Sequence, residues 1–243
     1  EVSPSDIPNY NPEQRYRATR ALYIPGEGWI NPKLTMEVFD VAVSSFRCVR
    51  FVDEEVSTLA LGSDGAIANV VLKDGSVEQG DKYLLASGAT VTDLLEKSKI
   101  DIPIQRVFYG IGVSVELHSP EYPHKKCVRT PNRGLACGLY TVPFFKVPDE
   151  PLNSLVVGAS NLISPTPSNH PRAVSVQSLL KGAMEQINTN FYRATVTNIN
   201  VGWRPTSADT YPIVGKTSIA NLIVATGTKR DGDVSGDTAD PGD

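Results

Sequence analysis

Short apolar runs bounded by turn residues dominate the chain and predict more strand than helix. Runs at 56–61, 66–72 and 76–79 are separated by Ser63-Asp64-Gly65 and Asp74-Gly75. Both separators are typical of tight hairpin turns, because glycine adopts a positive φ there at no steric cost. The three runs are therefore predicted to form a small antiparallel meander.

Helical spacing appears in three places. Asn31-Pro32 supplies a capping residue and a first-turn proline, and the apolar residues that follow are spaced for a helix to about Ser44. A strand is expected directly afterwards, at Cys48 to Val52. A short helix is expected from Thr92 to Lys97. The strongest helical pattern opens at Pro171 and continues to Phe191, with apolar residues at steps of three or four.

Residues 104–158 carry long β-rich segments with no convincing helix between them, which predicts a mostly antiparallel sheet. Tyr83 to Ala86 is typical of a buried parallel strand that leads into Ser87-Gly88-Ala89 at a ligand. Further strands are expected at 194–201 and 222–225. The whole pattern indicates an α/β (α+β) fold.

The two ends of the chain are expected to lie outside this fold. The first twenty residues contain three prolines among polar residues and are interpreted as an extended segment, so that the fold begins near Ala21. The last residues, 231–243, contain five aspartates and almost nothing apolar, and are expected to be disordered.

Composition narrows the classes of function. The chain has 243 residues, is 40% hydrophobic and carries a net charge of -4, so no overall charge attracts nucleic acid or an anionic membrane. No apolar stretch is long enough to span a membrane. The odd number of cysteines, Cys48, Cys127 and Cys137, favours free thiols and a cytoplasmic location. Small molecules are the partners left to consider.

Three common kinds of site are not favoured by the residues. Gly26-Glu27-Gly28 and Gly110-Ile111-Gly112 lack the third glycine and the strand-to-helix context of a dinucleotide-binding turn. Gly158 to Leu162 lacks the closing glycine of a hydrolase elbow around Ser160. Side chains of zinc-ligand chemistry have spacings that match no common site, so no metal is predicted: His118, His124, Cys127 and Cys137.

Arg204 and Arg230 are the candidates for binding an anionic group. Arg204 precedes Pro205 and is expected to follow a strand, where a fixed backbone would hold its guanidinium ready for a carboxylate. Arg230 comes just after a strand that ends in Thr226-Gly227 and is expected to converge on the same place. For any single arginine, however, a surface ion pair is the commoner role.

The segment that holds both arginines resembles a known family. From Gly202 to Gly232 it follows the pattern G-[LFW]-R-P-x(3)-D-x-x-P-x-[IV]-G, then a strand and G-x-x-R-[ND]-G. This pattern resembles the carboxy-terminal signature of the D-amino-acid oxidase or glycine oxidase family of FAD enzymes. Residues 22–32 and 81–89 resemble further segments of the same family, and the likeness covers nearly all of residues 21–232.

The resemblance implies FAD as cofactor and a role for each matched residue. Val56 would contact the adenine, and Ser87 and Gly88 would lie beside the adenosine or pyrophosphate. Arg204 and Arg230 would bind the substrate carboxylate, with Tyr140 as a further candidate. The turn around the isoalloxazine would consist of Gly227, Thr228, Lys229, Arg230, Asp231 and Gly232. No catalytic acid or base is implied, because hydride transfer to a flavin depends mainly on orientation.

The resemblance also implies a division of the chain. Residues 1–103 would be the remainder of a FAD-binding domain, 104–194 a mostly antiparallel substrate-binding domain, and 195–243 a return to the FAD domain. Family members begin with a G-x-G-x-x-G unit, and none is recognised before Ala21. Three explanations stay open: a truncated chain, a split enzyme whose second polypeptide carries the missing unit, and a degenerate paralogue.

The expected function is therefore the oxidation of a C–N bond in an amine or amino acid by hydride transfer to FAD. The enzyme would be an amine or amino-acid oxidase or dehydrogenase, and the 243 residues alone are expected to be inactive. The alternative is a flavin-free, degenerate subunit that serves as a binding or scaffold module.

Overall fold

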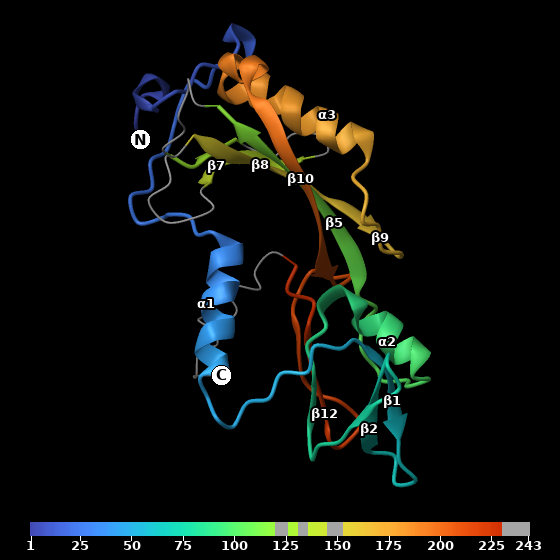
Figure 1. Cartoon of the computed structure of the whole chain (residues 1–243). Helices are drawn as coiled ribbons and strands as arrows, with labels where there is room; N and C mark the ends of the chain where they lie inside the picture. Colours follow the sequence, from blue (N-terminus) through green and yellow to red (C-terminus); the bar gives the residue numbers. More distant parts are fainter. Residues whose placement is uncertain (120–125, 131–135, 145–152, 230–243) are drawn as a thin grey trace. The chain divides into compact units, whose positions relative to one another are not determined.

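The protein has two compact units, each with its own core. The computed structural model describes residues 1–119, 126–130, 136–144 and 153–229 (Figure 1). Unit 1 comprises Glu1–Phe51, Gly112–Asn161 and Ser168–Val201, and unit 2 comprises Val52–Ile111, Leu162–Pro167 and Gly202–Asp243. Strands β5 (Phe108–His118) and β10 (Thr195–Thr206) each contribute residues to both units. Helices with largely antiparallel sheets confirm the predicted α/β (α+β) class.

Unit 1 is an antiparallel sheet with helix α3 on one face. The strand order is β10-β5-β8-β7-β6, with β6 at Val128–Arg129, β7 at Ala136–Phe144 and β8 at Ser154–Ser160. Successive side chains of a strand point to opposite faces, so Val113, Val115 and Leu117 of β5 all enter the core under α3.

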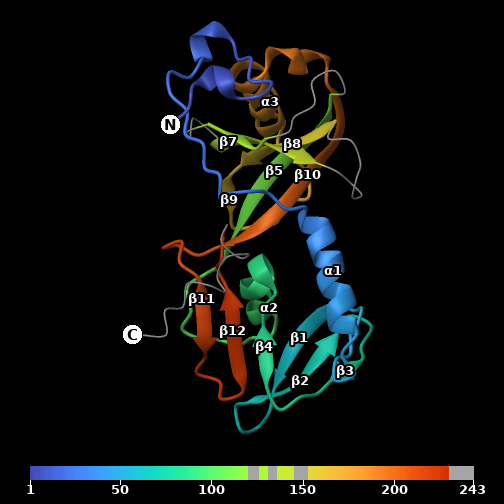
Figure 2. The same ribbon diagram turned by 90° about the vertical axis from the view of Figure 1, so that its left-hand side faces the viewer.

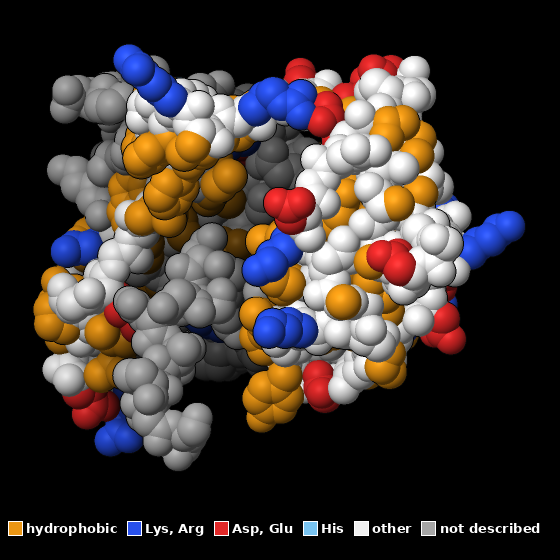
Figure 3. Space-filling view, turned by 90° about the horizontal axis from the view of Figure 1, so that it is seen from below, with side chains coloured by type: hydrophobic (Ala, Val, Ile, Leu, Met, Phe, Trp, Pro, Cys, Tyr) orange, Lys and Arg blue, Asp and Glu red, His pale blue; other side chains and the backbone are white. Residues whose placement is uncertain are grey.

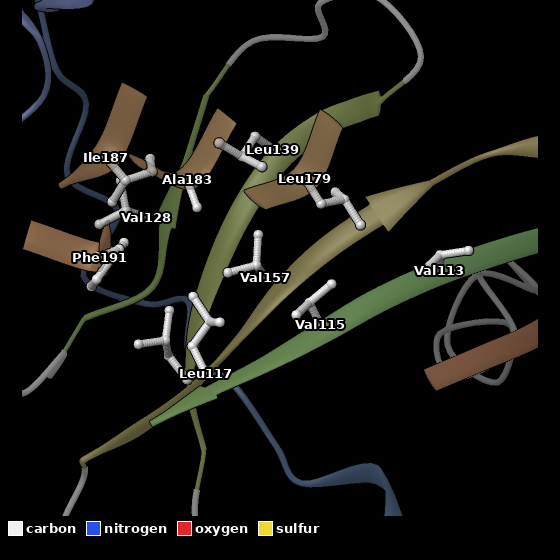
Figure 4. Close-up of a cluster of buried hydrophobic side chains, with 11 residues drawn as sticks. Val113, Val115, Leu117, Val128, Leu139, Val157, Leu179, Ala183, Ile187 and Phe191 are labelled. Carbon is white, nitrogen blue, oxygen red and sulfur yellow. The ribbon is translucent and has the colours of Figure 1, made fainter. Parts of the chain in front are cut away.

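The core of unit 1 joins this sheet to the helical segment. Figure 4 shows its side chains pointing toward one another between the strands and α3 (Ala173–Gly182). The buried members are Val113, Val115, Leu117, Val128, Leu139, Leu155, Val157, Leu179, Ala183, Ile187 and Phe191. The predicted apolar spacing after Pro171 is thus the buried face of this segment.

The helical segment is not one regular helix, as its spacing had suggested. It changes at Gly182 into a π-helix, Ala183–Ile187, and then into a 3₁₀-helix, Thr189–Arg193. Asn188 stops the helical path with an extended backbone, and its side chain caps the next turn by accepting a hydrogen bond from the N–H of Asn190. The π-helix presents the backbone oxygen of Glu185 to another part of the chain.

That other part is the N-terminal segment, which the sequence wrongly placed outside the fold. The N–H of Glu13 donates to the oxygen of Glu185 at 2.8 Å, and the N–H of Asn11 donates to the oxygen of Ile187 at 2.9 Å. A bridge between Val2 and Ala21 pairs the two ends of the segment. The prediction failed because these contacts are between backbones far apart in sequence, which no local pattern reports.

Helix α1 (Pro32–Ser44) confirms the predicted capping signal. The Asn31 side chain accepts hydrogen bonds from the N–H groups of Lys33 and Leu34, and Pro32 occupies the first turn. None of the 13 residues of α1 is buried. The strand expected at Cys48 to Val52 is wrong, because this stretch has no strand assignment in the structure.

Unit 2 contains two three-stranded sheets. The antiparallel sheet β1-β2-β3 is the predicted meander, and the second sheet has the order β11-β12-β4, with β4 parallel to β12 (Figure 2). The strands are β1 (Val56–Leu61), β2 (Ile67–Leu72), β3 (Val77–Glu78), β4 (Tyr83–Leu85), β11 (Ile213–Lys216) and β12 (Leu222–Thr226). Helix α2 (Val91–Lys97) follows β4 as predicted.

One apolar core holds these elements of unit 2 together. Its buried members are Leu59, Ile67, Leu85, Val91, Leu94, Leu95, Ile100, Ile102, Leu222 and Val224. They come from both sheets, from α2 and from the segment that follows α2. The compact units are defined by packing, whereas the division predicted at residues 103 and 194 concerns function. That functional division stays a prediction.

Two strands of the structure are not among the predicted ones, and a third is longer than predicted. β9 (Leu162–Ser164) pairs with Tyr109–Ile111 of β5, and β11 pairs with β12. β10 continues beyond Val201 to Thr206, so Arg204 lies within a strand and does not follow one. Pro205 is tolerated there because β10 is at the end of the strand order, where a missing N–H interrupts no ladder on its outer side.

Replacing Leu179 by Ala should destabilise the protein by about 2–5 kcal/mol, because the side chain is 1% exposed and its removal leaves a cavity under α3. The matched control is Leu22→Ala in the same unit, where the side chain is 75% exposed and a change within about 0.5 kcal/mol is expected. Urea unfolding of both variants checks this. Equal losses would mean that the core lies elsewhere.

Candidate functional site

Two segments far apart in sequence meet where the parallel strands of unit 2 end. Strand β4 pairs in parallel with β12, with Tyr83, Leu84 and Leu85 opposite Leu222, Ile223 and Val224. Both strands therefore end at the same edge of the sheet. The Thr226 hydroxyl donates to the backbone oxygen of Gly88 at 2.8 Å. In open sheets with parallel strands, ligands bind at the carboxyl ends of the strands. Ser87, Gly88 and Gly227 therefore occupy the expected position for a cofactor.

The backbone at this edge takes conformations that favour glycine. Gly88 has φ 59° and Gly227 has φ 74°. A Cβ on Gly227 would lie 3.2 Å from the N of Ile213 and 3.2 Å from the O of Tyr211, whereas a Cβ on Gly88 would meet nothing within 4 Å. Gly227 is thus needed for close backbone packing, and Gly88 leaves open space at the edge of the sheet.

Arg204 lies next to the turn that follows β12. The N–H of Lys229 donates to the oxygen of Pro205 at 2.8 Å, and Thr206 forms an isolated antiparallel bridge with Thr228. The structure therefore brings together Arg204 with the residues that the sequence assigned to the turn, Gly227, Thr228 and Lys229. The remaining residues of that turn, Arg230, Asp231 and Gly232, lie outside the described residues.

Gly110 on β5 allows the backbone around Arg204 on β10 to lie close to β5. A Cβ at this position would lie 2.6 Å from the Thr206 hydroxyl, 3.0 Å from the Arg204 oxygen and 3.2 Å from the Arg204 Cβ. No side chain other than hydrogen fits there without movement of β10. The neighbour that approaches Gly110 so closely is strand β10 of the same protein.

A buried tyrosine orients the residue before Arg204. The Tyr109 hydroxyl donates to the Asp93 carboxylate, and the Tyr109 ring meets the Trp203 ring edge-on, with centroids 5.4 Å apart at 88°. Burial, the hydrogen bond to Asp93 and the negative charge of Asp93 raise the pKa of Tyr109 far above its ordinary value. Sequence reasoning missed this pair. Its only signal was a tyrosine beside Gly110 on a long strand.

A short loop leads from the end of β10 at Thr206 to β11. Within it, the Ser207 hydroxyl donates to the oxygen of Tyr211 at 2.7 Å, and the Asp209 carboxylate accepts from the N–H of Tyr211 and from the Gln105 side chain. These bonds lower the pKa of Asp209, with the Tyr211 backbone bond as the largest cause. The loop is thereby shaped so that the backbone oxygen of Tyr211 lies close to Gly227.

Val56 and Tyr140 belong to other strands than the residues of this cluster. Val56 begins β1, pairs with Leu72 in the meander of unit 2 and packs partly against its core. Tyr140 belongs to unit 1, on β7, where its ring covers Gly158 of the neighbouring strand so closely that no Cβ would fit. Leu139 enters the core of unit 1, so the strand alternation directs Tyr140 to the sheet face away from α3.

The structure offers little for the other classes of site. In the described residues, no group of three or more His, Cys, Asp or Glu side chains is placed to hold a metal ion. Ser160 is buried, and its hydroxyl accepts a hydrogen bond from the N–H of Val113 at 3.0 Å. Over the same ranges of the chain, none of the helices has the length and apolar character of a membrane span.

Replacing Gly110 by Ala should destabilise the protein by about 1–3 kcal/mol, because the new methyl group overlaps Thr206 and the backbone of Arg204. Gly202→Ala is the control on β10, since a Cβ there meets nothing within 4 Å. It should be neutral or should stabilise by up to about 1 kcal/mol. Chemical denaturation measures both, and a neutral Gly110→Ala would argue against the close approach.

The contribution of Tyr109 to the free energy of unfolding should decrease at alkaline pH. Since its pKa is raised on folding, the contribution is complete below the unfolded pKa of about 10 and decreases as pH rises toward the folded value. The difference in unfolding free energy between the wild type and Tyr109→Phe should be constant below about pH 9. Above about pH 10 it should shrink by about 1.4 kcal/mol per pH unit. A difference that stays constant to pH 11 would contradict the raised pKa.

Comparison with known proteins identifies a family and several relatives of this chain. The family described as "DAO: FAD dependent oxidoreductase" matches residues 2–236. A bifunctional protein ThiO/ThiG from Trichormus variabilis is 30% identical over 174 residues, which cover 71% of this chain and 24% of that protein. The chain thus spans about a quarter of the length of the curated relatives that it matches.

Solved structures show the same fold. Iminodiacetate oxidase from Chelativorans sp. BNC1 has a TM-score of 0.65 at 24% identity, over 81% of this chain and 48% of that one. Glycine oxidase from Geobacillus kaustophilus has a TM-score of 0.59 at 24% identity, over 75% and 44%. Because the family match covers residues 2–236, the chain belongs to the DAO family of FAD-dependent oxidoreductases, as its sequence predicted.

Proposed function

We propose that the chain forms the substrate side and half of the flavin site of an enzyme that oxidises a C–N bond in an amine or amino acid. The observation that carries this proposal is the attachment of the Arg204 strand to the turn at Gly227–Lys229, through the bond from Lys229 to Pro205 and the bridge between Thr206 and Thr228. A cation for a substrate carboxylate and a glycine turn suited to a cofactor are thereby held side by side.

The residues at the edge of unit 2 fit FAD, the cofactor of the family. Gly88 leaves its backbone open at the end of a parallel strand, which suits the close approach of a dinucleotide. We assign Ser87 and Gly88 to the adenosine or pyrophosphate and Val56 to the adenine. Gly227, Thr228 and Lys229, with Arg230, Asp231 and Gly232 beyond the described residues, are assigned to the isoalloxazine.

The chain's own contribution to the reaction is binding and orientation. When bound, FAD accepts a hydride, so the substrate loses a hydride from carbon and a proton from nitrogen and becomes an imine. Arg204, with Arg230, pairs with the substrate carboxylate and fixes which C–H bond is presented. Gly110, Tyr109 and Asp93 act on Arg204 through the backbone and through Trp203. No base from this chain is required.

Tyr140 is proposed as a further substrate contact on the substrate-binding sheet of residues 104–194. Its place on β7, on the face away from the core of unit 1, supports this role. Residues 1–103 and 195–243 are proposed to belong functionally to the FAD domain. The parallel pair β4 and β12, drawn from these two stretches, supports that division.

We further propose that a dinucleotide-binding unit with the pyrophosphate turn completes the enzyme, either in the same polypeptide or in a second one. Helix α1 has no buried residue, although its sequence is largely apolar. Several of its apolar side chains are more than half exposed: Met36, Val38, Phe39 and Val41. Figure 3 shows hydrophobic side chains gathered at the surface. Soluble proteins rarely leave such a patch uncovered, and a partner unit would bury it.

The cytoplasm is the proposed compartment. Cys48 and Cys127 are free and exposed, which suits a reducing environment. The alternative function, a flavin-free scaffold subunit, is not favoured by a family match that covers residues 2–236.

The visible spectrum of the natively purified protein, recorded with its intact mass, tests the cofactor. The expected result is a yellow protein with oxidised-flavin absorbance. A colourless preparation of the complete gene product would contradict the proposal and favour the scaffold alternative.

Replacing Arg204 by Ala should weaken use of a carboxylate substrate by about 2–4 kcal/mol in kcat/KM, because a desolvated carboxylate loses its charged partner. Arg204→Lys keeps the charge but loses the planar fork, so it should recover only part of the loss. An amine substrate without a carboxylate is the control and should react equally well with all three proteins. Equal losses for both substrates would mean that Arg204 does not bind the carboxylate.

A further inference from the structure

A cavity lies in unit 1. It has a volume of about 390 Å³. Its lining comes mainly from the N-terminal segment, with Thr130 after β6 and Gln186 from the π-helix. The volume is within the range of about 300–1,000 Å³ that is usual for small-molecule sites.

The lining is rich in positive charge. Arg15, Arg17 and Arg20 all contribute, and no Asp or Glu is among the described residues that line the cavity. Arg15 is occupied by Glu13 at 2.9 Å and by Glu185 at 3.1 Å. Arg20 has only an exposed pair with Glu1, and Arg17 has no ion pair within the described part of the chain. Arg17 is therefore open to an anion, and Arg20 could accept one in exchange for its exposed pair with Glu1.

The cavity wall is held in place by contacts to the helical segment. The N–H of Ala18 donates to the Tyr10 hydroxyl at 3.1 Å, which closes the segment from Tyr10 to Ala18 into a loop. Asn11 exchanges backbone hydrogen bonds with Ile187 and Thr189, and its side-chain amide donates to the Thr189 hydroxyl at 3.1 Å. The loop that carries the arginines is thus fixed before any ligand arrives, which lowers the entropic cost of binding.

Aromatic side chains add flat surfaces to the same wall. Tyr10 and Tyr16 both line the cavity, and the Arg15 guanidinium lies over the Tyr16 ring, 4.8 Å from its centroid. Arginine binds phosphate and carboxylate groups through paired N–H donors in a planar fork. Donors of this kind beside apolar ring faces suit a small organic anion.

We propose that this cavity binds a small anion bearing phosphate or carboxylate groups, with Arg17 and Arg20 as its charged ligands and Thr130 as a polar neighbour. The lining residues all belong to unit 1, whereas Arg204, which is assigned to the substrate carboxylate, belongs to unit 2. An anion held by Arg17 and Arg20 stabilises the N-terminal segment against the helical segment.

Isothermal titration of the full chain with inorganic phosphate and with citrate, at ionic strength matched by sodium chloride, tests the proposal. Binding of either probe is expected, and the two arms distinguish a phosphate ligand from a carboxylate ligand. Arg17→Ala should weaken the binding by about tenfold or more, as for the loss of one strong charged hydrogen-bonding partner. Because Arg17 has no ion pair in the described chain, this change should leave the fold intact, which circular dichroism verifies.

Arg172→Ala is the matched control, since Arg172 is an exposed arginine of the same unit outside the cavity lining. It should change the affinity by less than about twofold. Arg20→Ala provides a second cavity variant and should also weaken binding. The proposal is overturned if neither probe binds at about 10 mM, or if Arg172→Ala weakens binding as much as Arg17→Ala, which would indicate nonspecific attraction by surface charge.

Discussion

The parallel pairing of β4 with β12 is the constraint on which the site depends. These strands are separated by more than a hundred residues in sequence, and their register sends Ser87-Gly88 and Thr226-Gly227 out of the same edge of the sheet. The apolar core under the pair, which includes Leu85 and Leu222, keeps that register, because a slip by one residue would turn buried side chains toward solvent. The backbone bond from Lys229 to Pro205 then fixes Arg204 beside the same turn.

Local signals in the sequence were sufficient for much of the fold. The cap at Asn31, the turns around Gly65 and Gly75 and the β-rich run of β5 each depend on neighbours within a few residues. The cluster of Arg204 with the turn at Gly227 was expected from the positions of the two arginines beside strand ends, and the family resemblance supported it. In physical terms it requires β12 to pair with β4 and β11, which no short window of sequence specifies.

Where the sequence misled, long-range contacts decided the outcome. The N-terminal segment looked like an unstructured entry, but its backbone bonds to Glu185 and Ile187 make it part of unit 1. β10 was expected to end before Arg204, yet its position at the end of the strand order lets it continue through Pro205. The link from Asp93 through Tyr109 to Trp203 joins a helix to two strands, and only the folded structure brings them together.

The proposed enzyme is tested most directly by mixing amino acids and amines with the purified, flavin-bound protein in the absence of oxygen and recording the visible flavin absorbance. We expect at least one amino acid to bleach the oxidised-flavin band in a single turnover and to yield the corresponding imine or its hydrolysis product. An intact band with every such substrate, in a protein whose flavin a chemical reductant bleaches readily, would contradict the proposed oxidation of a C–N bond.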